Sequence, residues 1–225
     1  MNAPIRDWEP AYAARASRMQ ASEIRELLKL LEQPDVISFA GGIPDPALFP
    51  REAAARAYAE IMAEPAEAAR ALQYSISEGH SGLRQWIVEH MRGRGVDCGI
   101  DNVVITSGSQ QGLDFLARLL LSPGDTALVT WPTYLGALQA FNAYEPRYER
   151  LMPLAGNRPA ASYAEAAAGA VPGGRVKFAY VVPDFANPTG ETMTLETRQR
   201  LLALAEELDI PVIEDAAYAA LRYDG

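Results

Sequence analysis

Short apolar runs alternate with longer amphipathic stretches along the second half of the chain. The apolar runs predict strands at 103–106, 126–131, 148–152, 177–182 and 211–214. Apolar residues at helical spacing predict helices at 109–121, 134–143, 162–169 and 194–209. Apolar strands interleaved with helices are typical of a mostly parallel sheet that is flanked by helices on both faces. We therefore predict an α/β fold.

The first hundred residues give a less regular pattern. We expect residues 1–21 to form an irregular arm, and SEIRELLKLLEQ at 22–33 has the apolar spacing of an amphipathic helix. ISFAGGIPDPALFP at 37–50 contains too much glycine and proline for regular structure, so we predict an extended loop. Further helices are predicted at 51–64 and 81–93.

Composition excludes several classes of protein. The 225 residues carry a formal charge of −9, whereas nucleic-acid binding needs a basic surface. No apolar run is long enough to span a membrane, and the N-terminus lacks the apolar core of a secretory signal. The single cysteine, Cys98, cannot form an internal disulfide, which favours a reducing compartment. We therefore expect a cytoplasmic protein with no nucleic-acid or membrane partner, and we assign no metal site.

Four unusual stretches follow predicted strands, where parallel α/β sheets bind ligands. The first is TSGSQQG at 106–112, at a predicted strand-to-helix turn. Small residues there let backbone N–H groups and a helix N-terminus approach an anion closely, so Ser107, Gly108, Ser109 and Gln110 could hold a phosphate. The alternative interpretation is a tight turn capped by a serine.

The second and third stretches are WPTY at 131–134 and PDFANPTG at 183–190. Tyr134 opens a predicted helix and could lay its ring against a flat ligand, although aromatic residues at helix starts also serve in plain packing. Two prolines bracket the rigid turn that carries Asn187, whose amide could donate to a phenolate oxygen. The alternative for Asn187 is an Asx-turn that satisfies its own backbone.

The fourth stretch, PVIEDAAY, places Asp215 and Tyr218 after a buried strand. A carboxylate is tolerable there if a ligand supplies a cation, and a pyridinium nitrogen would serve. The alternative is a helix cap formed by Asp215. Taken together, an anion cradle, a stacking aromatic, a phenolate donor and a carboxylate for a ring nitrogen complement one ligand, pyridoxal 5′-phosphate.

From about residue 17 to its last residue, the sequence resembles the fold-type I pyridoxal-phosphate-dependent aminotransferases of class I and II. The branch that includes 2-aminoadipate aminotransferases is the most similar. The motifs that carry the resemblance follow the family's order: ISFAGGIPDPALFP, LQYSISEGHSGLR, TSGSQQGLDFLARLLLSPGD, PTYLGALQAF, FANPTG and VIEDAAY. The resemblance implies a transferase that moves an amino group from an amino acid to a 2-oxo acid.

The same resemblance implies roles for single residues. Residues 107–110 would hold the cofactor's phosphate, and Tyr134 would stack on its pyridine ring. Asn187 and Tyr218 would hydrogen-bond the 3-oxygen of the ring, and Asp215 would pair with the ring nitrogen.

Other residues would act at the substrate or in the neighbouring subunit. Tyr74 is expected to reach the phosphate of that subunit, which implies a homodimer. Gly41 and Gly42 match the loop that lies over the substrate. Arg25 matches a position that meets a distal substrate carboxylate, and an exposed helical arginine is the alternative there.

One expected residue is absent. The family needs a Schiff-base lysine, which follows a strand downstream of the motif ending at Tyr218. Lys29 and Lys177 are the chain's only lysines, and neither is placed for that role, because Lys177 precedes a strand on the side opposite the cofactor. We therefore expect an N-terminal piece of a longer enzyme that is inactive alone. We divide it into an arm, helix and substrate loop at 1–50 and part of the cofactor-binding large domain at 51–225.

Three other functions remain open at this stage. The pocket motifs do not separate transamination from decarboxylation or from the elimination reactions of a lyase on the same fold. One family of transcription regulators fuses a DNA-binding domain to this fold, so an effector domain is conceivable. The missing lysine also fits a non-catalytic protein that binds pyridoxal phosphate.

Overall fold

The computed structural model describes residues 7–19, 42, 44–152 and 156–224. The chain divides into two compact units, Met1–Gln20 with Ser107–Gly225, and Ala21–Thr106. The helix predicted at 22–33 and the first part of the predicted loop at 37–50 lie outside the described residues.

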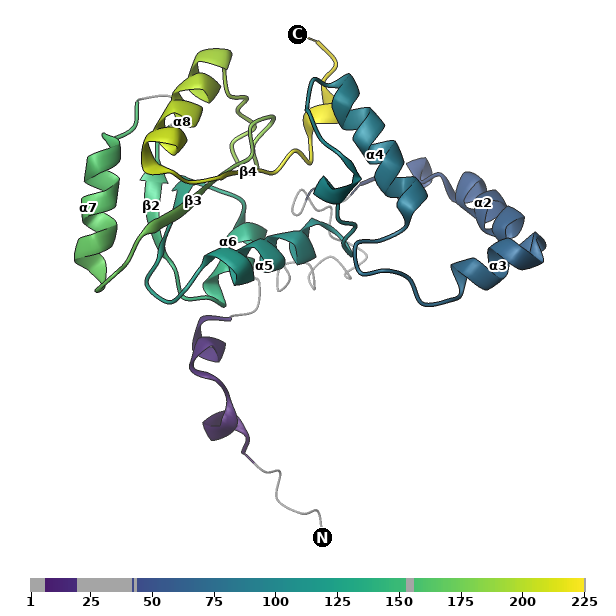
Figure 1. Ribbon diagram of the computed structural model, residues 1–225, viewed down its shortest axis with the longest axis horizontal. Coiled ribbons are helices and arrows are strands. Elements are labelled where there is room, and N and C mark those ends of the chain that lie inside the picture. The colour runs from purple at the N-terminus through teal and green to yellow at the C-terminus, as the bar shows by residue number, and fades with distance from the viewer. Residues whose placement is uncertain (1–6, 20–41, 43, 153–155, 225) are drawn as a thin grey trace, which may run out of the picture. The chain divides into compact units, whose positions relative to one another are not determined.

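A parallel sheet forms the centre of the first unit (Figure 1). Its strands are β1 Thr126–Thr130, β2 Arg147–Leu151, β3 Val176–Val181 and β4 Val212–Glu214. They lie in the order β2-β1-β3-β4, and every neighbouring pair is parallel. In register, Val129 pairs with Arg150 and with Tyr180, and Val181 pairs with Glu214. The predicted α/β fold with a mostly parallel sheet is confirmed.

Helices cover both faces of this sheet, because alternate strand residues point to opposite sides. The helices of the unit are α5 Ser109–Leu120, α6 Leu135–Asn142, α7 Ala160–Ala170 and α8 Leu195–Leu208. Val129 and Tyr180 pack with α5 and α6, whereas Leu128 and Ala179 pack with α7 and α8. These two apolar layers fix the positions of the strands, and the strands in turn position the loops at their carboxyl ends.

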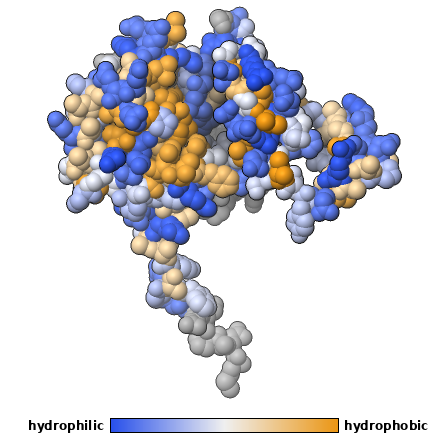
Figure 2. Space-filling model, in the orientation of Figure 1, coloured by the Kyte–Doolittle hydropathy of each residue, from blue (hydrophilic) through white to orange (hydrophobic). Residues whose placement is uncertain are grey.

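Figure 2 shows where apolar residues reach the surface of this unit. They gather between α8 and the α5–α6 layer, on the side where β4 is the last strand of the sheet. Ile213 on β4 is half-buried against the α5–α6 layer, and Val212 is half-buried against the α7–α8 layer. In the described part of the chain, β4 therefore presents one unpaired edge flanked by apolar side chains.

The second unit is helical where it is described. It contains α2 Arg51–Ala63, α3 Pro65–Ala71 and α4 Ser81–Gly93. The predictions at 51–64 and 81–93 match α2 and α4. We did not predict α3, which begins with a proline at the first helical position, where a missing N–H costs nothing. The predicted irregular arm forms two short 3₁₀ turns, Glu9–Ala11 and Ala14–Arg18.

The strand predicted at 103–106 does not form. The backbone is extended at Val103, but its carbonyl accepts a hydrogen bond from Arg84 Nε at 2.8 Å instead of from a neighbouring strand. The Ile105 N–H donates to the Glu78 carbonyl at 2.9 Å. These backbone groups are satisfied by a loop and by a buried guanidinium, so the apolar run has no ladder to join.

Among the described residues, no helix is long and apolar enough to cross a membrane. Those residues also contain no group of three or more histidine, cysteine or acidic side chains that could hold a metal ion.

Candidate functional site

Segments at the carboxyl ends of β1, β3 and β4 carry four of the predicted site residues, Tyr134, Asn187, Asp215 and Tyr218. Trp131–Tyr134 follows β1, residues 182–193 follow β3, and Asp215 follows β4 directly. Because all the strands are parallel, these loops meet at one end of the sheet.

Asp215 is half-buried and hydrogen-bonded to a tyrosine in the core. The Tyr180 hydroxyl donates to Asp215 Oδ2 at 2.8 Å, and the Asp215 N–H donates to the Val181 carbonyl at 2.9 Å. Tyr180 itself is fully buried on β3. This pairing fixes the carboxylate at the strand end, with one oxygen occupied by Tyr180, and it differs from the alternative of a simple helix cap.

Tyr180 interacts with Asp215, Tyr134 and Tyr218. Burial raises the pKa of the Tyr180 phenol, and its hydrogen bond to Asp215 raises the pKa further. The nearby Tyr134 and Tyr218 also raise this pKa by electrostatic interaction. Tyr134 and Tyr218 both pack against the α5–α6 side of the sheet, where Tyr180 lies. Asp215 thus bonds the Tyr180 hydroxyl, and Tyr134 and Tyr218 pack against the same side of the sheet.

The ring of Tyr134 lies over the first turn of α6. A Cβ atom added to Gly136 would stand 2.4 Å from Tyr134 Cζ, so the ring can occupy this place only because residue 136 has no side chain. Gln110 Nε2 donates to the Gly136 carbonyl at 2.7 Å and so joins the start of α5 to the start of α6. The side chain of Gln110 thus has a structural partner, which its sequence position did not reveal.

The N-terminus of α5 follows a left-handed glycine. Gly108 is its N-cap residue, with φ 82°, in the region that favours glycine. A Cβ at Gly108 would meet no atom within 4 Å, and the Ser107 N–H donates to Gln111 Oε1 at 2.7 Å. The first N–H groups of a helix have no acceptor within the helix, so an anion in this space would receive hydrogen bonds. Ser107, Ser109 and Gln110 are exposed around it.

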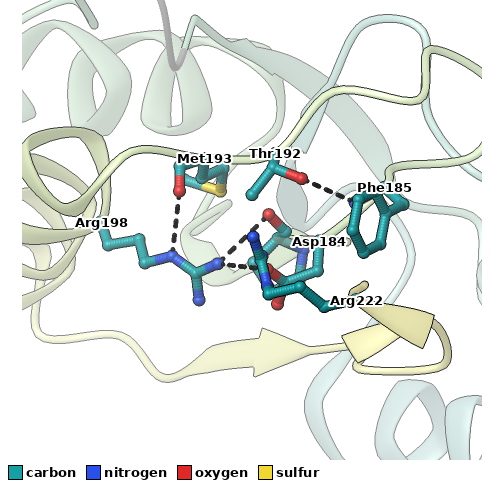
Figure 3. A network of polar contacts seen from close by, with 7 residues as sticks. Asp184, Phe185, Thr192, Met193, Arg198 and Arg222 are labelled. Carbon is teal, nitrogen blue, oxygen red and sulfur yellow. Dashed lines mark hydrogen bonds and ion pairs between the residues drawn. The ribbon is translucent and has the colours of Figure 1, made fainter. Parts of the chain in front are cut away.

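The loop after β3 carries Asn187 at its exposed tip. Hydrogen bonds close the loop below the tip, from Met193 N to the Pro183 carbonyl at 2.8 Å and from Ala186 N to the Glu191 carbonyl at 2.8 Å. Phe185 N donates to Thr192 Oγ1 at 3.2 Å, and its φ of 49° is left-handed (Figure 3). Asn187 is therefore presented by a loop that is closed by hydrogen bonds.

Two arginines converge on Asp184 at the base of this loop (Figure 3). Asp184 Oδ1 accepts from Arg198 Nη2 at 2.8 Å and from Arg222 Nη2 at 2.6 Å. Arg198 comes from α8, and Arg222 comes from the segment that follows Tyr218. Sequence reasoning missed this cluster. A buried acidic residue beside the NPTG turn was a usable signal, because such a carboxylate needs cationic partners.

The remaining predicted residues lie in the second unit. Tyr74 is 98% exposed, and Gly42 occupies a turn with φ 56°. Gly41 and Arg25 lie outside the described residues.

Lys177 lies at the opposite end of the sheet from Asp215. It is the second residue of β3, one position inside the strand that we expected it to precede, and its Nζ is 3.9 Å from Asp125 Oδ2. Asp125 immediately precedes β1. The predicted remoteness of Lys177 from the carboxyl ends of the strands agrees with this position.

A cavity of about 230 Å³ opens beside the site, at the carboxyl ends of β1, β2 and β3. Trp131, Arg150, Ala186 and Glu191 contribute to its walls, and none of the predicted site residues does. Tyr134, Tyr218 and Ala186 pack against the α5–α6 side of the sheet, and Ala186 also lines this cavity.

Comparisons with known proteins identify the family of the chain. A family model for aminotransferases of class I and II matches residues 34–225. The chain is 44% identical over its whole length to aromatic-amino-acid aminotransferase 1 of Thermococcus litoralis, and 41% identical over 96% of its length to the 2-aminoadipate transaminase of Thermus thermophilus. It covers 54% and 52% of these relatives, so it spans about half of their length.

A solved structure shows the same likeness in three dimensions. The kynurenine aminotransferase of Pyrococcus horikoshii, solved in complex with PMP, superposes with a TM-score of 0.82 at 41% identity. The match covers 97% of this chain and 54% of that one.

Proposed function

Because the chain belongs to the aminotransferase family of class I and II, we propose that the whole protein transfers an amino group from an amino acid to a 2-oxo acid, with pyridoxal 5′-phosphate as its cofactor. The observation that carries the proposal is the half-buried Asp215 carboxylate, hydrogen-bonded to Tyr180, whose phenol also interacts electrostatically with Tyr134 and Tyr218. An acidic group in this setting suits a cationic ring nitrogen better than a neutral ligand.

The donors and acceptors of the site fit the cofactor. The N-terminus of α5, where Ser107, Gly108, Ser109 and Gln110 are exposed, suits a phosphate because helix N-termini attract anions. In the described part of the chain, Thr133 Oγ1 is buried without a hydrogen-bond partner, which leaves a hydroxyl for a ligand beside Tyr134. The donor set thus matches a phosphorylated, aromatic and cationic molecule.

Each residue has a separate task in this proposal. Tyr134 supports one face of the ring, and Asn187 and Tyr218 donate to the ring's 3-oxygen. Asp215 holds the proton of the ring nitrogen, while Tyr180 keeps the carboxylate in one orientation. When bound, the cofactor supplies an electron-withdrawing ring that stabilises negative charge on the substrate's α-carbon. The chain's own contribution is to bind this ring and to keep it protonated.

The relatives suggest the class of substrate. They are named for aromatic amino acids, 2-aminoadipate and kynurenine, so we propose an amino donor with a long or aromatic side chain. Gly41 and Gly42 would belong to the loop over the substrate, and Arg25 would meet a distal carboxylate. The division of the chain at residue 50 stays part of this proposal.

We also propose a homodimer in the cytoplasm. The ring of Tyr74 is almost fully exposed, which supports a role in contacting the phosphate bound to a second copy. The single cysteine supports a reducing compartment. Light scattering during gel filtration measures the oligomeric state, and a monomer at micromolar concentration with cofactor present would contradict the dimer.

Titration of the purified chain with pyridoxal 5′-phosphate tests the cofactor site. Asp215→Asn keeps the shape of the side chain but removes its charge. A charge-assisted hydrogen bond is worth about 1.5–3 kcal/mol, so we expect about 10- to 100-fold weaker binding, measured by quenching of tryptophan fluorescence. Glu214→Gln is the matched control, because Glu214 is the exposed neighbouring acid on β4. Equal affinity of the Asp215 variant and the parent chain would contradict the proposal.

A further inference from the structure

Asp184 connects two segments that are far apart in the sequence. Its residue is only 8% exposed, and its Oδ1 receives one hydrogen bond from Arg198 and one from Arg222. Figure 3 shows both guanidinium groups directed at this carboxylate from different elements. A buried carboxylate with two charged donors is held more firmly than a surface ion pair, because solvent screens it less.

Arg198 secures the base of the Asn187 loop. Its Nη2 donates to the Pro183 carbonyl at 3.3 Å, and its Nε donates to the Met193 carbonyl at 3.2 Å. Pro183 and Met193 are the two residues that close the loop by their own backbone hydrogen bond. Arg198 therefore links the loop to α8. Asp184 accepts a hydrogen bond from Arg198 and a second one from Arg222, so it extends this link to another segment.

Arg222 brings the second segment to the same carboxylate. It follows the 3₁₀ turn Ala219–Leu221, in which Leu221 N donates to the Tyr218 carbonyl at 2.9 Å. Its guanidinium also lies 5.2 Å from the centre of the Phe185 ring. The segment that carries Tyr218 is thus attached to the loop that carries Asn187, through Asp184 and Phe185.

We propose that Asp184 and Arg222 are positioning residues, which hold Asn187 and Tyr218 at the spacing needed for both to donate to the 3-oxygen of pyridoxal 5′-phosphate. This inference rests on the proposed function, because it assumes that Asn187 and Tyr218 share that oxygen. The ion pair acts at a distance from the ligand, through the backbone of the two segments. Its loss is expected to weaken recognition of the 3-oxygen and to leave the other contacts with the cofactor unchanged.

Two ligands separate this role from a general structural one. The first is pyridoxal 5′-phosphate, and the second is its analogue with hydrogen in place of the 3-hydroxyl group. We expect the parent chain to bind the first at least about tenfold more tightly, since two hydrogen bonds are lost with the second. In Arg222→Met this preference should fall to about twofold or less, while affinity for the analogue stays within about twofold of the parent. Asp184→Asn should shift the preference in the same direction.

Arg200→Met is the matched control. Arg200 also lies on α8, and its Nη1 is 3.7 Å from Oε1 of the exposed Glu196. This variant should keep the full preference. Hydrogen exchange gives a readout without ligand, and in Arg222→Met the peptides covering 183–193 and 216–223 should both exchange faster than in the parent. Circular dichroism verifies that each variant is folded, and Arg222→Lys, which keeps the charge, should recover part of the preference.

The outcomes distinguish the two proposals. If the parent prefers the cofactor over its analogue and Arg222→Met keeps that preference, the positioning role is wrong and the cofactor site stands. Equal losses for both ligands in Arg222→Met would show a purely structural role and would also overturn the inference. If the parent chain shows no preference, the assignment of Asn187 and Tyr218 fails, and the inference fails with it.

Discussion

The Tyr180 hydroxyl is a polar group on a strand whose other buried residues are apolar. A buried phenol needs a hydrogen-bond partner, and this one finds it in Asp215, at the point where the site begins. The sequence revealed Asp215, because an acid after a buried strand demands an explanation. It did not reveal Tyr180, since a tyrosine within KFAYVV is equally typical of plain strand packing.

Tyr180→Phe should weaken cofactor binding while leaving the core packed. The substitution removes the donor to Asp215 Oδ2, so the carboxylate loses a fixed orientation. A hydrogen bond to a charged group is worth about 1.5 kcal/mol or more, which predicts about tenfold weaker binding of pyridoxal 5′-phosphate. Fluorescence titration measures the effect. Tyr148→Phe is the control, because the Tyr148 hydroxyl bonds Asn142 instead, and a loss of affinity in both variants alike would contradict the prediction.

Tyr180 also predicts how stability depends on pH. Burial raises its pKa in the folded protein, whereas a tyrosine in the unfolded chain titrates near its ordinary value of about 10. The folded state therefore keeps the proton longer, and its stability is complete below about pH 10 and falls as the pH rises above that value. Thermal melts from pH 8 to pH 11 should show a smaller alkaline loss in Tyr180→Phe than in the parent. Identical slopes would argue against a buried phenol.

At the scale of elements, periodicity predicted most of the helices and strands, including both ends of α4 at 81–93. It failed at 103–106, where β propensity was present but the backbone partners were a loop carbonyl and Arg84. It also missed α3, in which Pro65 occupies the first helical position. The pattern of apolar and polar residues indicates which segments favour a helix or a strand. The availability of backbone hydrogen-bond partners decides whether that element forms.

The start of α6 shows how an element shapes the site. Gly136→Ala would place a Cβ against the Tyr134 ring, so the ring must move away from its seat. Overpacking of this kind costs about 1–3 kcal/mol, and we expect a lower melting temperature together with weaker cofactor binding. Gly169→Ala on α7 is the matched control, because its Cβ would meet nothing within 4 Å. That variant should be at least as stable as the parent, since alanine favours a helix more than glycine does. A stable Gly136→Ala variant with parental affinity would show that the ring position is unimportant.

At the scale of the whole molecule, the common direction of the strands separates the two ends of the sheet. Asp215, Tyr134 and Tyr218 gather at the carboxyl ends, whereas Lys177 lies near the amino end of β3 and beside Asp125. Strands rise about 3.3 Å per residue, so the length of β3 separates Lys177 from the site. This polarity could be inferred from the alternation of strands and helices alone. The contacts that lock the loops, such as Asp184 with its two arginines, depend on side chains brought together only by folding.

This polarity predicts the result of chemical trapping. When the purified chain is mixed with pyridoxal 5′-phosphate and then reduced with borohydride, we expect no stoichiometric label on Lys177. Mass spectrometry of the digested protein measures the label. Any non-specific labelling of Lys177 should rise in proportion to the concentration of pyridoxal 5′-phosphate. The extent of this labelling should be the same in Asp215→Asn as in the parent chain. Full and saturable labelling of Lys177 would mean that the assigned site is wrong.

Phe185 has one more consequence. A bulky residue in the left-handed region carries a local strain of about 1–3 kcal/mol, which the surrounding fold must sustain even with no ligand bound. The fold thus holds this loop in a strained conformation before any ligand binds, and the strain lowers the thermal stability of the protein. A substitution at Phe185 that relaxes this turn is therefore expected to raise the melting temperature and to weaken ligand binding.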